Sequence, residues 1–333
     1  MKNRTNECNE SLLSHCRVQS VLCKKTAIAI LAAVCLIACG NSQNPKQQSA
    51  DSTSASQTRQ NDQDTPPETR VMTVGDDITF DLGTGVLTIR GVSYEFAYVH
   101  PGTFTMGATA DMKEADGNEH PAHKVTLTQG YYIGKTPVTW AFWKAVMGSY
   151  PSDAEGQGTA SGASKHPDNE PVNNISWEQA QKFAISLGAE FGECAEFRLP
   201  TEAEWEFAAR GGNKSKGYKY SGSNTIADVA WFADNTENGP HPVAKKKPNE
   251  LGIYDMSGNV WEWCSDVYAP YTTKAQTDPK GPEGLGETYV LRGGNCFMDA
   301  NNCRVTARYM DSSDNDDNPF YGLRIVYVEG QGH

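Results

Sequence analysis

The feature that most limits the possible folds is the absence of long regular elements after residue 212. From there the sequence contains only short strand-like pieces, separated by Gly, Asn, Asp and Pro. These residues favour turns and end helices and strands after a few positions. Hydrophobic residues still make up 38% of the chain, which is enough to bury a core. The sequence therefore predicts a folded body that is rich in loops.

Three stretches before that point predict short helices. Each begins with a residue that can cap a helix and ends at a glycine: TWAFWKAVMG (139–148), SWEQAQKFAISLG (176–188) and TEAEWEFAARGG (201–212). The second and third also have Gln or Glu three residues after the capping Ser or Thr, which is the spacing of a capping box. We expect the second helix to end at Gly188.

Alternating apolar and polar residues predict strands in several segments. Residues 71–91 include ITFDL and VLTIR, which favour a hairpin, and residues 94–107 and 123–134 continue as strands. Three short helices among many short strands and long loops indicate the α+β fold class.

The N-terminal segment 1–39 resembles the signal peptide of a bacterial lipoprotein. Lys24 and Lys25 precede the apolar run TAIAILAAVCLIAC, which is shorter than the roughly 20 residues that span a bilayer. The run ends in LIAC, which resembles a lipobox, and this resemblance implies that Cys39 carries the lipid. An ordinary cleaved signal or a short anchor is the alternative. A lipid on Cys39 would place the protein on a membrane of the bacterial cell envelope, on its periplasmic or surface side.

Residues 40–70 are expected to form a disordered linker. They contain no aromatic residue and no aliphatic residue larger than Ala. Such a segment buries too little apolar surface to offset the entropy lost on ordering. The predicted organisation is therefore a signal segment (1–39), a linker (40–70), N-terminal strands (71–91) and a domain over 92–328. The net charge of -12 argues against nucleic acid as a partner.

Five segments in the domain, taken in order, resemble the sulfatase-modifying-factor family, whose founding member is the formylglycine-generating enzyme. They are PVNNISWEQA, RLPTEAEWEFAARGG, NELGIYDMSGNVWEWCSD, LRGG and YGLRIV. The resemblance extends from about Val92 to Val328. It implies a C-type-lectin-like α+β fold with little regular secondary structure. We expect the tryptophans of these segments, Trp205, Trp261 and Trp263, to be structural.

The family resemblance also implies a calcium site. Asp255, Gly258, Val260 and Glu262 match the positions that hold calcium in the formylglycine-generating enzyme, the middle two through carbonyl oxygens. Carboxylate and carbonyl oxygens are the ligands that this cation prefers. The alternative is a self-contained turn in which backbone N–H groups satisfy Glu262. A second calcium position of the family maps around Asp228 and Val229, where the following loop is shorter, so calcium is not expected there.

The segment GGNCFMDANNCR (293–304) decides whether the chain is an enzyme. In the formylglycine-generating enzyme this place holds two cysteines that bind copper(I) as thiolates and oxidise a substrate cysteine. Here Asn295 and Met298 fall on the serine and first cysteine positions, and the loop is three residues shorter. Cys296 and Cys303 are both displaced from the catalytic register, so the catalytic cysteine pattern of the enzyme is not retained.

Three states remain open for these cysteines. Cys296 and Cys303 are the weak candidates for a copper-binding catalytic pair, they can form a disulfide with each other, or they remain unpaired or pair with Cys194 or Cys264. Copper is expected only if the chain is an active oxidase.

Three functions follow from these alternatives. The first is an envelope lipoprotein whose domain binds or assembles an unknown envelope protein or ligand without catalysis. The second is an oxidoreductase, either formylglycine-generating or a related oxygen-dependent enzyme. The third is a diversified lectin-like protein that binds a ligand through YMDSSDNDDNPFYGLR (309–324), a segment dense in Asn, Asp, Ser and aromatic residues.

Overall fold

The computed structural model describes residues 70–151, 167–192, 195–284, 286–315 and 318–329. The expected signal segment with Cys39 and the linker up to residue 69 lie outside these residues, as does Cys194. None of the helices within the described ranges has the length and apolar character needed to cross a membrane.

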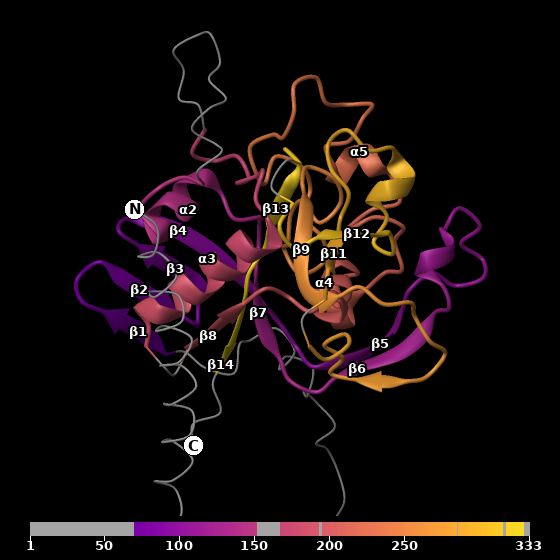
Figure 1. Ribbon diagram of the computed structural model, residues 1–333, viewed down its shortest axis with the longest axis horizontal. Coiled ribbons are helices and arrows are strands. Elements are labelled where there is room, and N and C mark those ends of the chain that lie inside the picture. The colour runs from indigo at the N-terminus through magenta and orange to yellow at the C-terminus, as the bar shows by residue number, and fades with distance from the viewer. Residues whose placement is uncertain (1–69, 152–166, 193–194, 285, 316–317, 330–333) are drawn as a thin grey trace, which may run out of the picture. The chain divides into compact units, whose positions relative to one another are not determined.

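Short strands dominate the described residues (Figure 1). They are β1 (Val71–Val74), β2 (Ile78–Asp81), β3 (Val86–Ile89), β4 (Val92–Val99), β5 (Gly102–Met106), β6 (His123–Leu127), β7 (Tyr131–Gly134), β8 (Ala195–Arg198), β9 (Trp261–Val267), β10 (Gln276–Thr277), β11 (Thr288–Arg292), β12 (Arg308–Ser312), β13 (Tyr321–Leu323) and β14 (Val326–Glu329).

The helices are α2 (Trp140–Met147), α3 (Trp177–Glu190), α4 (Glu202–Ala209) and the single turn α5 (Ile226–Val229). Short 3-10 turns lie at η1 (Gly117–Glu119), η3 (Gly212–Lys214) and η4 (Ala300–Cys303). The α+β prediction is confirmed, and α5 adds a turn of helix that the sequence did not indicate.

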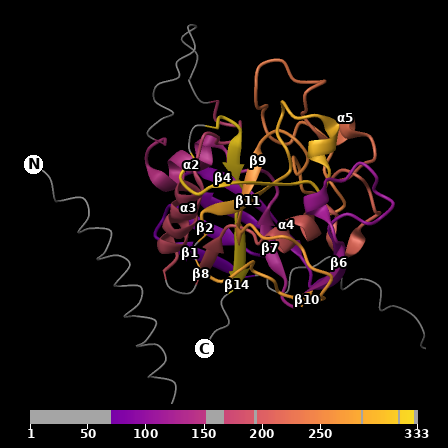
Figure 2. The ribbon, with the colours of Figure 1, turned by 45° about the vertical axis from the view of Figure 1, so that its right-hand side comes forward.

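The strands form three sheets. A seven-stranded sheet has the order β1-β2-β3-β4-β7-β14-β8, a four-stranded sheet the order β12-β11-β9-β13, and a three-stranded sheet the order β10-β6-β5. The strands of residues 71–91 belong to the large sheet, because β3 pairs antiparallel with β4 and Leu87 lies opposite Tyr94. In the turned view of Figure 2, α2 and α3 lie beside this sheet, whereas α4 lies among the loops of the other half.

The predicted helix starts are confirmed. Thr139 accepts a hydrogen bond from the N–H of Phe142, and α3 and α4 both begin with complete capping boxes. Gly148 ends α2 in the left-handed conformation.

The predicted end of α3 was wrong. The helix continues through Gly188 to Glu190, and Gly192 takes the left-handed conformation with a φ of 76°. Gly188 instead packs against β8, since a Cβ there would lie 3.4 Å from the carbonyl oxygen of Ala195. This glycine allows the helix and the strand to approach closely, which a pattern of local residues does not reveal.

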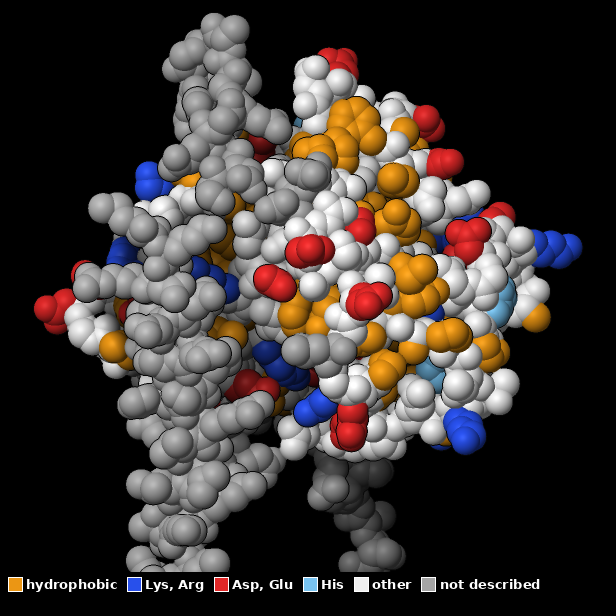
Figure 3. All heavy atoms as spheres, viewed as in Figure 1, with side chains coloured by type: hydrophobic (Ala, Val, Ile, Leu, Met, Phe, Trp, Pro, Cys, Tyr) orange, Lys and Arg blue, Asp and Glu red, His pale blue; other side chains and the backbone are white. Residues whose placement is uncertain are grey.

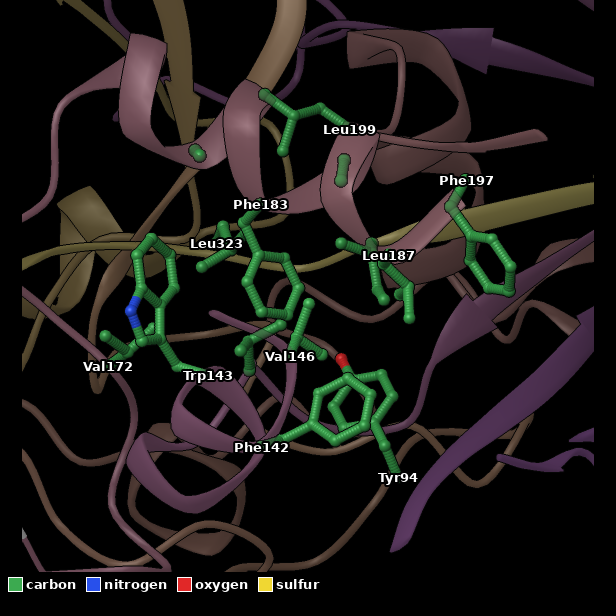
Figure 4. Close-up of a cluster of buried hydrophobic side chains, with 14 of the residues drawn as sticks. Tyr94, Phe142, Trp143, Val146, Val172, Phe183, Leu187, Phe197, Leu199 and Leu323 are labelled. Atoms are coloured by element: carbon green, nitrogen blue, oxygen red, sulfur yellow. The ribbon is translucent and has the colours of Figure 1, made fainter. Parts of the chain in front are cut away.

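The first core lies between the large sheet and the helices α2 and α3. Phe183 of α3 stacks on Trp143 of α2 with 5.0 Å between ring centroids, and Phe142 stacks on Tyr94 of β4 at 4.7 Å. Figure 4 shows these rings meeting with Leu187 and Leu323 in one apolar cluster. These stacked aromatic contacts hold the helical layer on the sheet.

The loop-rich half is held together by buried side chains that combine rings and ion pairs. The prediction that the three motif tryptophans are structural is confirmed by their burial, since Trp205 and Trp263 are 0% exposed and Trp261 is 3% exposed. Four buried arginines pair with buried glutamates: Arg292 with Glu206, Arg304 with Glu119, Arg308 with Glu202 and Arg324 with Glu262. Removing one partner of such a pair leaves an unpaired buried charge. These pairs therefore fix loops that lack regular hydrogen bonding.

Candidate functional site

The cysteine-containing loop leaves β11 through two glycines in left-handed conformations, with φ values of 98° at Gly293 and 76° at Gly294. A Cβ on Gly294 would lie 2.7 Å from the carbonyl oxygen of Asn302 and 2.8 Å from the sulfur of Cys303. Glycine is required here because the loop folds back tightly on its own far end.

This tight loop buries both candidate cysteines as free thiols. Cys296 and Cys303 are each 0% exposed. The Cys303 sulfur lies 3.9 Å from the carbonyl oxygen of Asn295 and packs in an apolar cluster with Val229 and Phe232. Cys264 of β9 is also a free, buried thiol. The structure therefore contains neither the 296–303 disulfide nor a pairing with Cys264.

Burial decides the protonation of these thiols. Desolvation raises the pKa of Cys296 to about 12 and that of Cys303 to about 12. Copper(I) and disulfide chemistry both require a thiolate. In the arrangement that the structure shows, burial therefore keeps these two sulfurs protonated at neutral pH.

Asp255 is the first residue of the expected calcium turn. It is 2% exposed and has a positive φ of 57°. Its Oδ2 accepts a hydrogen bond of 2.8 Å from the N–H of Ala244, whereas its buried Oδ1 has no partner among the described residues. Burial raises the pKa of this carboxyl to about 6. A buried oxygen of this kind fits a cation, which would supply its missing partner.

Glu262 fits a calcium ion less well. Both of its oxygens accept hydrogen bonds from Arg324, and Oε2 also accepts one of 2.6 Å from the indole of Trp205. Side chains satisfy it, not the backbone N–H groups of the alternative stated above. A calcium ion at this turn would have to share Glu262 with the arginine. The sequence contained Arg324 within YGLRIV but did not indicate this pairing, because the two residues are 62 positions apart.

The remaining predicted positions, Gly258 and Val260, were expected to act through their carbonyl oxygens. Gly258 has a φ of 77°, and Val260 is buried just before β9. Asp228 lies in α5 and pairs with Lys247 at 3.3 Å on the surface. Within the ranges that the structure covers, no group of three His, Cys, Asp or Glu side chains could hold a metal ion.

A partly exposed aromatic surface includes Phe297 of the cysteine loop. Phe297 is 48% exposed and its ring lies 5.0 Å from that of Phe320, while Tyr309 is 47% exposed and stacks at 5.5 Å on Trp261. The two pairs are joined, because the N–H of Trp261 donates to the carbonyl of Phe320. Figure 3 shows hydrophobic side chains interspersed with Asp and Glu on this half of the molecule. The term aromatic surface refers below to Phe297, Tyr309 and Phe320.

Residues 91–328 match a family model, that of the sulfatase-modifying factor enzyme 1-like domain. The chain is 33% identical over 249 residues to the "Chaperone protein LppX" of Paenibacillus barcinonensis, covering 61% of this chain and 81% of the relative. It is 34% identical over 272 residues to the formylglycine-generating enzyme of Streptomyces coelicolor, covering 64% of this chain and 83% of that enzyme.

The fold is also found in a solved structure, the "Treponema denticola variable protein 1". It superposes with a TM-score of 0.60 at 30% sequence identity, covering 77% of this chain and 98% of that protein. The relatives thus include a chaperone, an enzyme and a variable protein on one fold, so the local site must separate their functions.

Proposed function

This chain belongs to the family of sulfatase-modifying factor enzyme 1-like domains, and from this membership we propose that it is an envelope lipoprotein whose domain binds or assembles a partner without catalysis. The lipoprotein part rests on the LIAC sequence that ends in Cys39. A relative named as a chaperone supports a role in binding, since a chaperone acts by contact with other proteins.

The proposal of a non-catalytic role rests on one observation, the burial of the two thiols. Cys296 and Cys303 are fully buried, and burial raises the pKa of both to about 12. A substrate sulfur must form a bond with, or share a metal with, an accessible thiolate. Met298 occupies the position of the family's first cysteine and offers only a thioether, which cannot form a disulfide.

The aromatic surface supports the proposal that the region around the cysteine loop binds a partner. Exposed Phe and Tyr side chains supply large contact areas at a low cost in conformational entropy and are enriched where proteins bind one another. Here they lie directly beside the loop that would otherwise hold the catalytic cysteines. We therefore assign partner binding to Phe297, Tyr309 and Phe320.

The test is an oxidation assay on the mature protein. Loaded with copper(I) and supplied with a cysteine-containing sulfatase-type peptide in air, it should leave the peptide mass unchanged. The formylglycine-generating enzyme of Streptomyces coelicolor is the positive control under the same conditions. The Met298→Cys variant should also be inactive, because Cys303 remains a buried thiol whose pKa is raised to about 12.

An oxidoreductase is the second candidate, favoured by the 34% identity to that enzyme. Conversion of the peptide by the unmodified protein, abolished by Cys296→Ser or Cys303→Ser, would establish it and overturn the proposal. A diversified binding protein is the third, favoured by the likeness to the Treponema variable protein. Sequencing the gene from several isolates distinguishes it, since changes concentrated in codons 309–324 are expected only for a diversified surface.

A further inference from the structure

A cavity of about 500 Å³ lies away from the cysteine loop. Its lining comes mainly from the start of α4, the end of β9 and the segment that carries β10. These three elements are labelled in Figure 2. Much of its wall is apolar, with side chains of Met106, Ala203, Val267, Pro270, Pro279 and Pro282. The cavity is open to solvent on one side, so a ligand can reach the polar groups that line the remainder.

Asp266 is a buried lining residue that uses only one carboxylate oxygen for its hydrogen bonds to the described residues. It is 5% exposed, and its Oδ2 accepts hydrogen bonds from the N–H of Glu202 at 2.9 Å and from Ser265 Oγ at 3.1 Å. Its Oδ1 accepts no hydrogen bond from the described residues and, unlike Oδ1 of Asp255, is not shut off from solvent. The two donors to Oδ2 hold the carboxyl group in place, so Oδ1 is left as a fixed acceptor at the cavity wall.

The neighbouring carboxylate of Glu202 is already paired. Glu202 accepts two hydrogen bonds from Arg308, of 2.5 Å and 2.8 Å, and a third of 3.0 Å from the hydroxyl of Tyr271. Lys280 is exposed on the cavity lining and forms no ion pair with Asp266. Asp266 is therefore a buried acid whose cavity contains no cation directed at it.

The electrostatic environment of Asp266 favours a positive ligand. Burial, followed by the charge of Glu202, raises its pKa to about 7. Glu204 acts in the same direction. The other titratable groups that line the cavity are Tyr271, Arg308 and Lys280. A bound cation would offset the cost of ionising Asp266 and would lower its pKa.

We propose that this cavity binds a primary alkylammonium group, which donates to Oδ1 of Asp266 while the alkyl chain packs against the apolar wall. An ammonium carries three donors on a flexible apolar stem, so one free carboxylate oxygen and an apolar wall suit it. A hard divalent ion requires six or more oxygen ligands, and the described residues here offer one free carboxylate oxygen. The ammonium could come from a free amine or from a lysine side chain of a partner protein.

Binding is measured by titration calorimetry on the mature full chain with cadaverine, and in a second arm with Nα-acetyl-lysine methylamide, which represents a protein lysine. Pentane-1,5-diol, with the same chain and no charge, is the ligand control. Cadaverine or the lysine probe should bind and the diol should not. The tighter of the two amines identifies the source of the ammonium, and failure of both to bind overturns the proposal.

Asp266→Asn keeps an oxygen for the N–H of Glu202 and removes the charge. It should weaken amine binding at least about tenfold, because hydrogen bonds to charged groups are among the stronger ones. Asp234→Asn, at an exposed acid outside the cavity, is the matched control and should bind normally. Equal affinity in the Asp266 and Asp234 variants would overturn the assignment.

A second readout uses the unmodified protein and does not depend on a variant that folds. The carboxyl carbon of Asp266, followed by NMR, should titrate near pH 7, and added cadaverine should move that midpoint to lower pH. Amine affinity should accordingly rise between pH 6 and pH 8, where Asp266 ionises and the amine stays protonated. A midpoint that does not respond to saturating cadaverine would contradict binding at Oδ1.

Discussion

Asp255 and Glu262 show how differently two carboxylates of one motif can be satisfied. Glu262 is held by Arg324 and Trp205, whereas Asp255 keeps a buried oxygen without a partner in the described part of the chain. Burial raises the pKa of Asp255 to about 6, above the value near 4 expected in the unfolded chain. Without a cation, its contribution to stability is therefore present below about pH 4 and is lost as the pH rises through 6.

Calcium binding at Asp255 is expected to reverse that loss. At pH 7.5, a calcium concentration one hundred times the dissociation constant would add about 2.7 kcal/mol to the free energy of unfolding, which raises the melting temperature by several degrees. Melting curves with calcium and with chelator measure the difference. Asp255→Asn should abolish it. Identical curves for the unmodified protein would indicate that Asp255 is simply protonated in the native turn.

Among the elements, α4 begins with a capping box that an ion pair extends. The Thr201 side chain accepts from the N–H of Glu204, and the Glu204 carboxylate accepts from the N–H of Thr201 and pairs with Arg198 at 2.7 Å. This arrangement places Glu202 and Trp205 in the loop-rich core.

Replacing the cap should destabilise the protein by a measurable amount. Thr201→Ala is expected to lower the free energy of unfolding by about 1 kcal/mol, as typical for a lost N-cap. Thr225→Ala is the matched control, since Thr225 precedes α5 but its side chain makes no capping hydrogen bond. Urea unfolding of the two variants compares them, and equal midpoints would show that the cap of α4 contributes nothing.

At the scale of the whole molecule, the strands of residues 71–91 are part of the folded body. Phe80 of β2 is 0% exposed and contacts the rings of Phe96, Tyr132, Phe197 and Tyr327. The first core therefore includes a segment that precedes the family match, which begins at residue 91. A flexible linker from a lipid on Cys39 would consequently have to end before β1.

Lipid attachment at Cys39 is the prediction that concerns this tether. Mass spectrometry of the mature N-terminus should find an acylated Cys39, and several acyl chains would anchor the protein firmly where one would not. Cys39→Ser should leave the precursor unprocessed and without lipid. A mature N-terminus at any other residue would contradict the lipoprotein part of the proposed function.

Local patterns in the sequence were sufficient for several features. Short segments were enough to predict the capping residues of α2, α3 and α4, because caps depend on residues three or four positions apart. Short segments also predicted the α+β class and the family. The expected displacement of Cys296 and Cys303 from the catalytic register also came from spacing, and it stays a prediction.

Other features depend on residues that are distant in sequence. The protonated state of the two thiols follows from burial beneath a loop that closes on Asn302, and the satisfaction of Glu262 follows from Arg324, 62 positions away. The place of Asp266 on a cavity wall has the same origin, since the cavity is formed by α4, β9 and the β10 segment together. Burial and charge pairing are set by which segments meet in three dimensions, so only the tertiary structure decided them.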